Sequence, residues 1–382
     1  MAEKNIFIIT SSLESGVIDK SAIDVALTLS AHGFNITVAS AGGKMVKELK
    51  KQGIEHILLP LNSNDIFVMR RNLKKIIEIA NVRKISMMHT FTPQSSFYGF
   101  RASKLLKIPY ITSFLKIYKK PFWHLFNRTQ YMTRGIFVIA PSDFMAGYIQ
   151  STYRIAAEKI IIVPQWIDTE VYNANNVSAE RIIATASDLR IPEDHFIITT
   201  IDKLEKAHGQ AQLVAAIAKT PALKNKVRCL IVGQGGESKR YRSELEFQAE
   251  RMGVKDVVHV VMDANLDIPA LLMLSDVYVA TNTQPMASHI NLLQAQSLGR
   301  PIIASNIGST PEYILDDVSC RMYEPKNADD LAAAILWAMD LDEAKRADIS
   351  HKLASNIRLN FSRGTLPAKI GNIYNYILES RR

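Results

Sequence analysis

The sequence predicts an α/β fold built from two Rossmann-like, doubly wound domains that face a central cleft. Short apolar runs rich in β-branched residues alternate with helical patterns along nearly the whole chain, which is typical of parallel sheets with helices on both faces. The series restarts after a polar, turn-rich stretch at residues 173–188. The chain has 382 residues, 47% of them hydrophobic, which is enough for two domains with a core each. Folds of this kind bind ligands at the carboxyl ends of their strands.

The first half of the chain contains six apolar runs that we interpret as strands, at residues 6–9, 35–39, 57–59, 87–89, 111–113 and 137–139. Between the first two, a helix is predicted from Ser21 to His32, because its apolar residues share one helical face. Ser21 is a suitable cap for its start and Gly33 for its end.

The second half contains five such runs, at residues 196–200, 228–232, 257–260, 277–279 and 302–304. We therefore expect a first domain at residues 1–172, a linker at 173–188 and a second domain at 189–360. Residues 361–382 would follow as a helical segment that can return to the first domain.

The amino-acid composition indicates which classes of binding partner and which cellular compartment to expect. The formal net charge of +9 favours anionic partners, but no zinc-finger, RNA-recognition or helix-turn-helix pattern is present, so nucleic acid is not expected. Cys229 and Cys320 lack metal-ligand spacing and are expected to be buried, reduced thiols. The N-terminal apolar run is too short for a spanning helix and lacks the order of a signal peptide. We expect a cytoplasmic protein, with peripheral attachment at the inner face of the membrane as an option.

Residues 283–312 carry the most informative motif. The segment reads as a loop, a helix at about residues 290–298, a Gly-Arg-Pro turn at 299–301, a buried strand and a second loop that ends in Glu312. This order resembles the donor-sugar site of the family 4 glycosyltransferases, which have the two-domain architecture called GT-B. In that family the first loop carries a Glu followed by Gly-Phe-Gly, and a second Glu lies on the helix after seven intervening residues. Those positions fall here on Met286, Ala287, Ser288, His289 and Gln294, so both acids are replaced.

A second match lies after the first predicted strand of the second domain. Asp202-Lys203-Leu204, followed by His208-Gly209, is similar to the family's Gly-Arg-Leu and Lys-Gly, whose Arg and Lys hold the donor diphosphate. Lys203 supplies a point charge without the bidentate fork of Arg, and His208 is cationic only part of the time near neutral pH. Lys206 is close enough in sequence to compensate. The alternative is a solvated charge cluster without a ligand.

The matches in the first domain are weaker. The family's Gly-Gly-Ala-Glu loop falls on residues 16–19, so Gly16 and Asp19 are candidates for an acceptor or phosphate loop; an ordinary turn at Ser15-Gly16 is the alternative. The family's His-Gly falls on Leu115-Lys116, which leaves His89 as a substitute or as a purely structural histidine.

Three further turns resemble the family in order. Residues 164–168, Pro-Gln-Trp-Ile-Asp, match the family's Pro-Asn-Gly-Val-Asp turn, for which a structural role is expected. Residues 233–236 match its Gly-Asp-Gly turn, and residues 308–312 match Gly-Gly-x-Pro-Glu with Ser309 for the second Gly. The resemblance is closest to bacterial enzymes that build lipopolysaccharide or other envelope glycans.

The resemblance implies a retaining transferase that moves a sugar from a nucleotide-sugar donor to an envelope glycolipid or glycan acceptor, without a metal or other cofactor. Because both motif acids are replaced, weakened activity is expected. The rival interpretation is a degenerate binding or scaffold protein of the same fold, and a nucleotide-sugar epimerase is a third and less favoured class.

One segment suggests contact with an anionic membrane surface. Five cations are interleaved with five aromatic residues between residues 116 and 134: Lys116, Lys119, Lys120, Arg128 and Arg134 with Tyr118, Phe122, Trp123, Phe126 and Tyr131. Such a segment can lie at headgroup depth. The alternative is a helix whose aromatic side chains pack into the first domain.

Overall fold

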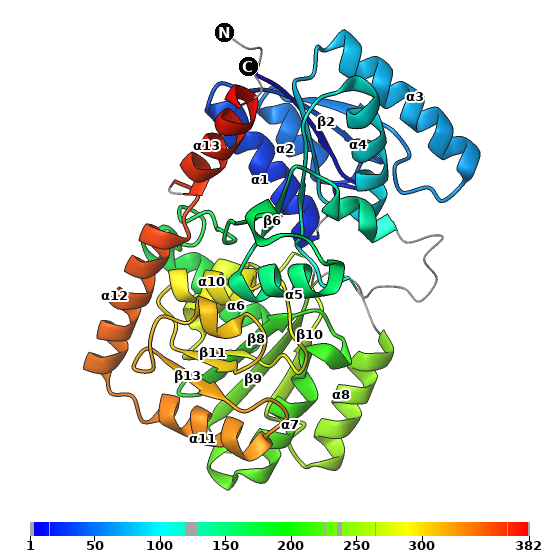
Figure 1. Cartoon of the computed structure of the whole chain (residues 1–382). Coiled ribbons are helices and arrows are strands. Elements are labelled where there is room, and N and C mark those ends of the chain that lie inside the picture. Colours follow the sequence, from blue (N-terminus) through cyan, green and yellow to red (C-terminus); the bar gives the residue numbers. More distant parts are fainter. Residues whose placement is uncertain are drawn as a thin grey trace. The chain divides into compact units, whose positions relative to one another are not determined.

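A computed structural model describes residues 4–14, 16–118, 128–224, 226–234, 239–263, 265–364 and 366–380. The chain forms two compact α/β units (Figure 1). The first unit is Met1–Pro164 together with Gly364–Arg382, and the second is Gln165–Arg363.

The first unit contains a seven-stranded parallel sheet in the order β3-β2-β1-β4-β5-β6-β7. All six strands expected in the first half are present, and a seventh strand was not predicted. The strands are β1 (Asn5–Ile9), β2 (Asn35–Ser40), β3 (Glu55–Leu58), β4 (Met87–Thr90), β5 (Tyr110–Ser113), β6 (Phe137–Ala140) and β7 (Ile160–Ile162). The helices are α1 (Val17–Ala31), α2 (Val46–Lys51), α3 (Ile66–Val82), α4 (Pro93–Leu106), η2 (Arg128–Thr133), α5 (Asp143–Tyr153), η3 (Ala157–Lys159) and α13 (Leu366–Glu379).

Helix α1 begins four residues before the predicted Ser21. Its start is fixed by Asp19 in the first turn, whose carboxylate accepts hydrogen bonds from the N–H groups of Glu14 at 3.0 Å and Gly16 at 3.3 Å. An acid in the first turn satisfies amides at the helix entry and complements the helix dipole, so Ser21 is not needed as a cap.

The second unit contains a six-stranded parallel sheet in the order β10-β9-β8-β11-β12-β13. The strands are β8 (Phe196–Asp202), β9 (Val227–Gly233), β10 (Val258–Val261), β11 (Val277–Ala280), β12 (Ile302–Ser305) and β13 (Cys320–Tyr323). The α-helices are α6 (Ala179–Asp188), α7 (Gln210–Lys219), α8 (Lys239–Arg251), α9 (Ile268–Leu274), α10 (Ile290–Ser297), α11 (Ala328–Met339) and α12 (Glu343–Asn360). The 3₁₀ turns are η4 (Ala174–Asn176), η5 (Lys206–His208), η6 (Pro221–Leu223) and η7 (Thr310–Tyr313).

Each face of this second sheet has its own buried apolar cluster. One cluster joins the sheet to α7, α8 and α11, and the other joins it to α9, α10 and α12. Cys229 belongs to the first cluster and Cys320 to the second, and both are buried free thiols. Burial raises the pKa of each thiol, which makes both poor nucleophiles.

The stretch expected to be a linker, residues 173–188, lies within the second unit and is largely ordered as η4 and α6. Ser178 caps α6 by accepting a hydrogen bond from the N–H of Arg181. Arg181 then forms two hydrogen bonds to Asp267, at 2.7 and 2.8 Å, and Asp267 caps α9. The units therefore divide at Pro164 and Gln165, earlier than the sequence suggested.

Helix α13 belongs to the first unit, where it packs against α1. Its Tyr374 hydroxyl contacts the Nδ1 atom of His89 on β4. In the part of the chain that the structure describes, no helix combines the length and apolar character needed to span a bilayer.

Candidate functional site

The strand order of the second sheet reverses between β8 and β11, so the chain after these two neighbouring strands leaves toward opposite faces. The loop after β8 leads to α7, and the loop after β11 leads to α10. In doubly wound sheets this switch point at the carboxyl edge is where ligands bind. The sequence-predicted residues of the second domain lie in these two loops and in α10.

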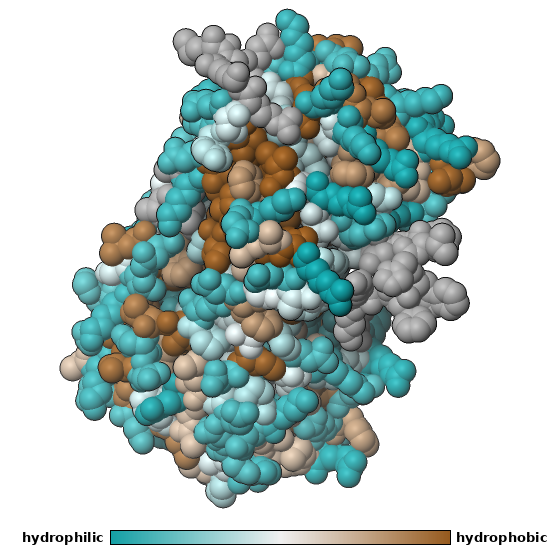
Figure 2. All heavy atoms as spheres, in the orientation of Figure 1, coloured by the Kyte–Doolittle hydropathy of each residue, from teal (hydrophilic) through white to brown (hydrophobic). Residues whose placement is uncertain are grey.

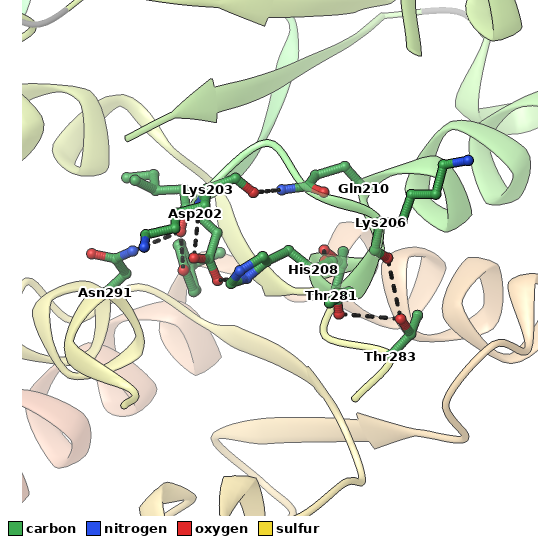
Figure 3. A network of polar contacts seen from close by, with 11 residues as sticks. Asp202, Lys203, Lys206, His208, Gln210, Thr281, Thr283 and Asn291 are labelled. Atoms are coloured by element: carbon green, nitrogen blue, oxygen red, sulfur yellow. Dashed lines mark hydrogen bonds and ion pairs between the residues drawn. The ribbon is translucent and has the colours of Figure 1, made fainter. Parts of the chain in front are cut away.

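The backbone of Lys203 is held on both sides (Figure 3). Its N–H donates to Oδ1 of Asp202 at 2.8 Å, and its carbonyl accepts from Nε2 of the buried Gln210 at 2.7 Å. The side chain of Lys203 itself is exposed. A fixed backbone with an exposed ammonium suits the binding of an anion at this edge.

His208 is fixed from three directions. Its Nδ1 atom lies 2.8 Å from Oδ2 of Asp202, and its side chain is 11% exposed. Its carbonyl accepts a hydrogen bond from the Thr281 hydroxyl, from the loop after β11. The next residue, Gly209, has φ +71°, and a Cβ there would lie 1.9 Å from the carbonyl oxygen of Thr281. Only glycine allows this close approach of the two loops.

Lys206 does not supply the compensating cation that the sequence suggested. Its side chain is 82% exposed, and Nζ lies 3.6 Å from Oε2 of Glu244 on α8. Figure 3 shows the side chain extending away from Asp202 and His208. The sequence distance between Lys206 and His208 was short, but η5 turns the two side chains in different directions.

The loop that replaces the family's Glu and Gly-Phe-Gly is held by its own network. The N–H of His289 donates to Oε1 of Gln165 at 2.9 Å, and its Nε2 lies 2.9 Å from the Ser309 hydroxyl. The Ser309 hydroxyl donates to the carbonyl of Met286 at 2.8 Å. Because that hydroxyl has only one proton, His289 Nε2 is the donor to Ser309. The imidazole also packs on the ring of Tyr313, with 4.9 Å between centroids.

His289 is a neutral, buried side chain. Burial lowers the pKa of its imidazole to about 4. Beside it, Ala287 is buried, and Met286 is half-buried. Two polar atoms of the loop, Oγ of Ser288 and Oδ1 of Asn282, are buried without a hydrogen-bond partner among the described residues. Unpaired buried polar atoms cost free energy, so a ligand that bonds them would be favoured.

Gln294 lies inside α10 and is buried. Its side chain forms a hydrogen bond with the hydroxyl of Tyr172, whose pKa is raised to about 12 by burial. At the start of the same helix, the side chain of the N-cap residue His289 makes no capping hydrogen bond among the described residues, and the Asn291 side chain donates to the carbonyl of Ile201 in β8 at 2.8 Å. The first-turn N–H groups of α10 therefore lie at the switch point, where they favour negative charge.

The predicted residues of the first unit have partners within the protein. The Asp19 carboxylate accepts hydrogen bonds from the backbone N–H groups of Glu14 and Gly16 in its own loop. It also lies 3.4 Å from the Ser12 hydroxyl. Burial raises the pKa of this carboxyl, although these hydrogen bonds oppose the shift. His89 is fully buried, with Nδ1 against Tyr374 and Nε2 2.9 Å from the Ser113 hydroxyl, and burial lowers its pKa to about 3. His89 thus joins β4 to α13 through Tyr374.

Several predictions fall outside the described residues. These are Gly235 and Gly236 of the glycine turn, and Lys119, Lys120, Phe122, Trp123 and Phe126 of the basic aromatic segment. Within the described part of that segment, Tyr131 packs against Phe97 and Phe100, at 5.5 and 5.6 Å. The described part of the chain contains no cluster of three His, Cys, Asp or Glu side chains that could hold a metal ion.

Comparison with known families agrees with this geometry. The family model described as "Glycosyltransferase Family 4" matches residues 18–171, and the one described as "Glycosyl transferases group 1" matches residues 183–356. The chain belongs to the family 4 type of GT-B glycosyltransferases. The two matches lie in successive halves and together cover most of the chain.

Two curated relatives are similar to parts of this glycosyltransferase-family chain. The D-inositol 3-phosphate glycosyltransferase of Segniliparus rotundus is 25% identical over 52% of this chain and 43% of its own length. The lipopolysaccharide 1,2-N-acetylglucosaminetransferase of Salmonella typhimurium is 22% identical over 59% of this chain and 58% of its own length. The chain therefore spans about half the length of these relatives.

Two solved structures establish the GT-B fold. A glycosyltransferase from Rickettsia africae is 24% identical, with a TM-score of 0.89 over 99% of this chain and 100% of that one. The Anabaena HepE protein in complex with UDP-glucose is 20% identical, with a TM-score of 0.83 over 97% of this chain and 99% of that one.

Sequence reasoning did not identify three residues that organise the site: Asp202, Gln165 and Ser309. A signal for Asp202 was present, since it occupies a family glycine position while the family's lysine has become His208. Paired departures of this kind can indicate contact. Gln165 gave no such signal, because it lies 124 residues from its partner His289.

Proposed function

We propose that this protein is a retaining glycosyltransferase that moves a sugar from a nucleotide-sugar donor to an envelope glycolipid or glycan. The family membership supports transfer as the reaction class. The complex of the similar HepE with UDP-glucose supports a nucleotide sugar as the donor, and the Salmonella relative supports an envelope acceptor. The observation that carries the proposal is the group of anion-binding features at one switch point: Lys203, His208 and the uncapped start of α10.

The proposed donor site comprises the two loops and the helix at this edge: Lys203, His208, Gly209, Met286, Ala287, Ser288, His289 and Gln294. In the reaction, the bond between the anomeric carbon and the diphosphate oxygen breaks, and a bond to the acceptor oxygen forms. The acceptor's proton passes to the departing diphosphate. Lys203 and the N–H groups of α10 would stabilise the charge that develops on the leaving group, often the largest catalytic contribution.

The same geometry supports weakened catalysis. Met286 has only a weakly accepting sulfur for the hydroxyl groups of the transferred sugar, so sugar alignment loses the ion-assisted hydrogen bonds that the family's acid makes. Gln294 retains an amide carbonyl that accepts from a ribose hydroxyl, once it exchanges its hydrogen bond with Tyr172. Loss of alignment lowers the rate of transfer without removing the leaving-group stabilisation.

The proposed acceptor-binding site is the loop at Gly16 in the first unit. Its amides at Glu14 and Gly16 bond to Asp19, so an acceptor phosphate would compete with that carboxylate. His89 is a fully buried residue of β4, and we assign it no acceptor contact.

Calorimetric titration with UDP-glucose and GDP-mannose tests the proposal. We expect saturable heat with one of these donors, and a roughly tenfold or greater loss of affinity in Lys203→Ala, because a diphosphate contact by a cation is charge-assisted. Lys224→Ala, an exposed lysine after η6, is the control and should not change affinity. Donor binding without any sugar transfer or donor hydrolysis would favour the rival scaffold function. No binding to a panel of nucleotide sugars, or normal affinity in Lys203→Ala, would contradict the donor site.

An anionic membrane surface is the second proposed partner. The first unit carries 25 lysines and arginines against 11 acids, whereas the second carries 21 against 26, so the whole positive balance lies in the first unit. On α3, Ile66 is 52% exposed and Phe67 is 74% exposed, and four exposed cations follow them: Arg70, Arg71, Lys74 and Lys75. In Figure 2, hydrophobic and hydrophilic atoms lie side by side over the region that α3 occupies in Figure 1. Exposed aromatic and basic groups on one helix favour an anionic lipid interface.

A further inference from the structure

A cavity of about 380 Å³ lies in the second unit, beside η5. Its walls come from η5, the start of α7, α8, the loop after β11 and the turn that joins β13 to α11. Small-molecule sites have volumes of about 300–1,000 Å³, so the cavity is large enough to hold a ligand. Among the described residues that line it, Gly209 is the one shared with the proposed donor site. The cavity is therefore a separate candidate site.

The wall that α8 contributes is fixed by hydrogen bonds to α7. Nε2 of Gln248 donates to the carbonyl of Ala211 at 2.9 Å, and the Tyr241 hydroxyl shares a hydrogen bond with the backbone of the same residue. Tyr241 and Leu245 also belong to the buried apolar cluster between the sheet and these helices. This wall is thus preformed and partly apolar, which suits the carbon skeleton of a small ligand.

The cavity contains a polar group that lacks a partner. Gln212, on the first turn of α7, lines the cavity, and its Oε1 atom is buried without a hydrogen-bond partner among the described residues. An unpaired buried acceptor costs free energy. The neighbouring Gln248 uses its Nε2 atom for Ala211, which leaves its amide oxygen as a second acceptor. A ligand with hydroxyl groups would donate to both amide oxygens.

Two lysines from different elements line the same cavity, Lys206 on η5 and Lys326 on the turn after β13, and both are exposed. Nζ of Lys206 lies 3.6 Å from Oε2 of Glu244, and the Lys206 side chain is 82% exposed, so this ion pair is weak. Oε1 of Glu244 also accepts from Arg240 at 3.1 Å. Glu244 therefore keeps a cationic partner when Lys206 turns to a ligand, and the two lysines favour an anion.

The cavity and the proposed donor site lie on different sides of η5. In Figure 3, Lys206 and Thr283 lie together on one side of His208, and Asp202 and Lys203 lie on the other. The Thr283 hydroxyl donates to the carbonyl of Ala207 at 3.1 Å, which joins η5 to the loop after β11 at the cavity. A ligand in the cavity would thus contact η5 from the face opposite Lys203.

We propose that this cavity is a second ligand site, which binds a small phosphorylated polyol such as a sugar phosphate. The phosphoryl group would lie between Lys206 and Lys326. The hydroxyl groups would donate to the amide oxygens of Gln212 and Gln248, and Leu245 would contact the carbon skeleton. This binding goes beyond the proposed transfer reaction, because it uses none of the side chains assigned to the donor.

Calorimetric titration of the full chain with glucose 6-phosphate, inorganic phosphate and glucose tests the inference. We expect saturable heat with glucose 6-phosphate, roughly tenfold weaker binding of inorganic phosphate, and no saturable heat with glucose, because the anion and the hydroxyl groups both contribute. Lys206→Gln and Lys326→Gln should each weaken glucose 6-phosphate binding roughly tenfold. Both side chains are exposed, so the variants should fold normally. Lys224→Gln, at an exposed lysine after η6, is the matched control and should bind as the wild type does.

Gln212→Leu separates the hydroxyl contact from folding. The substitution keeps most of the side-chain volume and replaces an unpaired acceptor with an apolar group, so the Tm should equal or exceed the wild-type value. The affinity for glucose 6-phosphate should fall to that for inorganic phosphate, and the affinity for inorganic phosphate should not change. Equal wild-type affinities for the two probes, or full glucose 6-phosphate affinity in Gln212→Leu, would overturn the assignment of a polyol ligand.

Two further measurements separate this site from the donor site. Glucose 6-phosphate binding should be unchanged in Lys203→Ala, and UDP should not displace the sugar phosphate. Loss of binding in Lys203→Ala, or displacement by UDP, would place the sugar phosphate in the donor site and overturn the second site. Absence of saturable heat with glucose 6-phosphate, or unchanged affinity when Lys206→Gln and Lys326→Gln are combined, would overturn it as well. None of these results depends on whether the protein transfers a sugar.

Discussion

At the scale of single residues, the loop before α10, which we propose as part of the donor site, is held by contacts within the protein. The family's second glycine has become His289, whose imidazole bonds to Ser309 and packs on Tyr313. The backbone N–H of His289 donates a hydrogen bond to the side-chain oxygen of Gln165. A loop that the family keeps open for close approach of its amides is here braced by side chains from two other segments. Such bracing fixes the position of α10, which begins at the next residue.

We predict that Gln165→Leu destabilises the protein and weakens donor binding. The substitution keeps most of the side-chain volume but leaves the N–H of His289 buried without an acceptor, which costs about 1–3 kcal/mol. Thermal unfolding should show a lower Tm, and calorimetry with the donor should show lower affinity, because α10 loses a constraint at its start. Gln150→Leu, on the exposed side of α5, is the matched control. A variant with the wild-type Tm and affinity would show that Gln165 does not hold the loop.

Residues within the motif could be predicted from the sequence, and their partners could not. Lys203 and His208 were identifiable because a short local pattern carries them, and the structure places both at the switch point. The contact between Gln165 and His289 joins positions 124 residues apart, and only the folded backbone brings them together. The expectation that Lys206 compensates for His208 rested on their nearness in sequence, but the Lys206 side chain lies near Glu244 instead.

At the scale of helices and strands, periodicity predicted most of the fold because buried parallel strands are continuous apolar runs. Strands β7 and β13 and helix α6 were missed. Strand β13 has only four residues, and Arg321 within it is exposed. Strand β7 has only three residues before Val163 and Pro164, and α6 is polar over most of its surface and is held by the Arg181–Asp267 pair rather than by a wide apolar face. The contact that holds α13 to the first unit, between Tyr374 and His89, likewise depends on polar atoms that hydrophobic patterning does not report.

We predict that the anchoring of α13 weakens in acid because His89 is buried as a neutral side chain. Its pKa is lowered from 6.5 to about 3 by burial, so the unfolded chain binds a proton more readily than the folded one. The contribution of neutral His89 to the stability of the folded protein is fully present above pH 6.5 and is lost as pH falls toward 3. Lowering the pH from about 7 to about 5 should cost about 2 kcal/mol from this group.

Thermal unfolding of the wild type and of His89→Gln at these two pH values measures the effect. The variant should be less stable at neutral pH, because Tyr374 and Ser113 lose their histidine partner, and its Tm should fall less on acidification. His351→Gln, at an exposed position of α12, should retain the wild-type acid response. An equal fall in Tm for His89→Gln and the wild type would refute the neutral, buried role of His89.

At the scale of the whole molecule, charge is divided between the units. The formal net charge of +9 is the sum of a net charge of about +14 on the first unit and about −5 on the second. The sequence supplied the total, but only the boundary at Pro164 and Gln165 and the return of α13 assign the charges to units. The described part of the predicted basic aromatic segment also packs inward through Tyr131. Among the described residues, exposed basic and aromatic side chains also lie together on α3.

We predict reversible binding of this protein to anionic vesicles through α3. Each cation near an anionic leaflet contributes about 1 kcal/mol, so reversing two of them removes at least about 2 kcal/mol, which is more than tenfold in affinity. Lys74→Glu with Lys75→Glu should therefore abolish flotation with phosphatidylglycerol vesicles, and Phe67→Ser should reduce it by removing an exposed ring. Phe247→Ser is the matched control, because Phe247 is 60% exposed on α8 of the acidic second unit. Recovery should also fall with rising salt, since exposed charges are screened within a Debye length. Equal recovery on neutral and anionic vesicles, or full recovery of the charge-reversed variant, would assign the positive balance of the first unit to a soluble anionic ligand instead of a membrane.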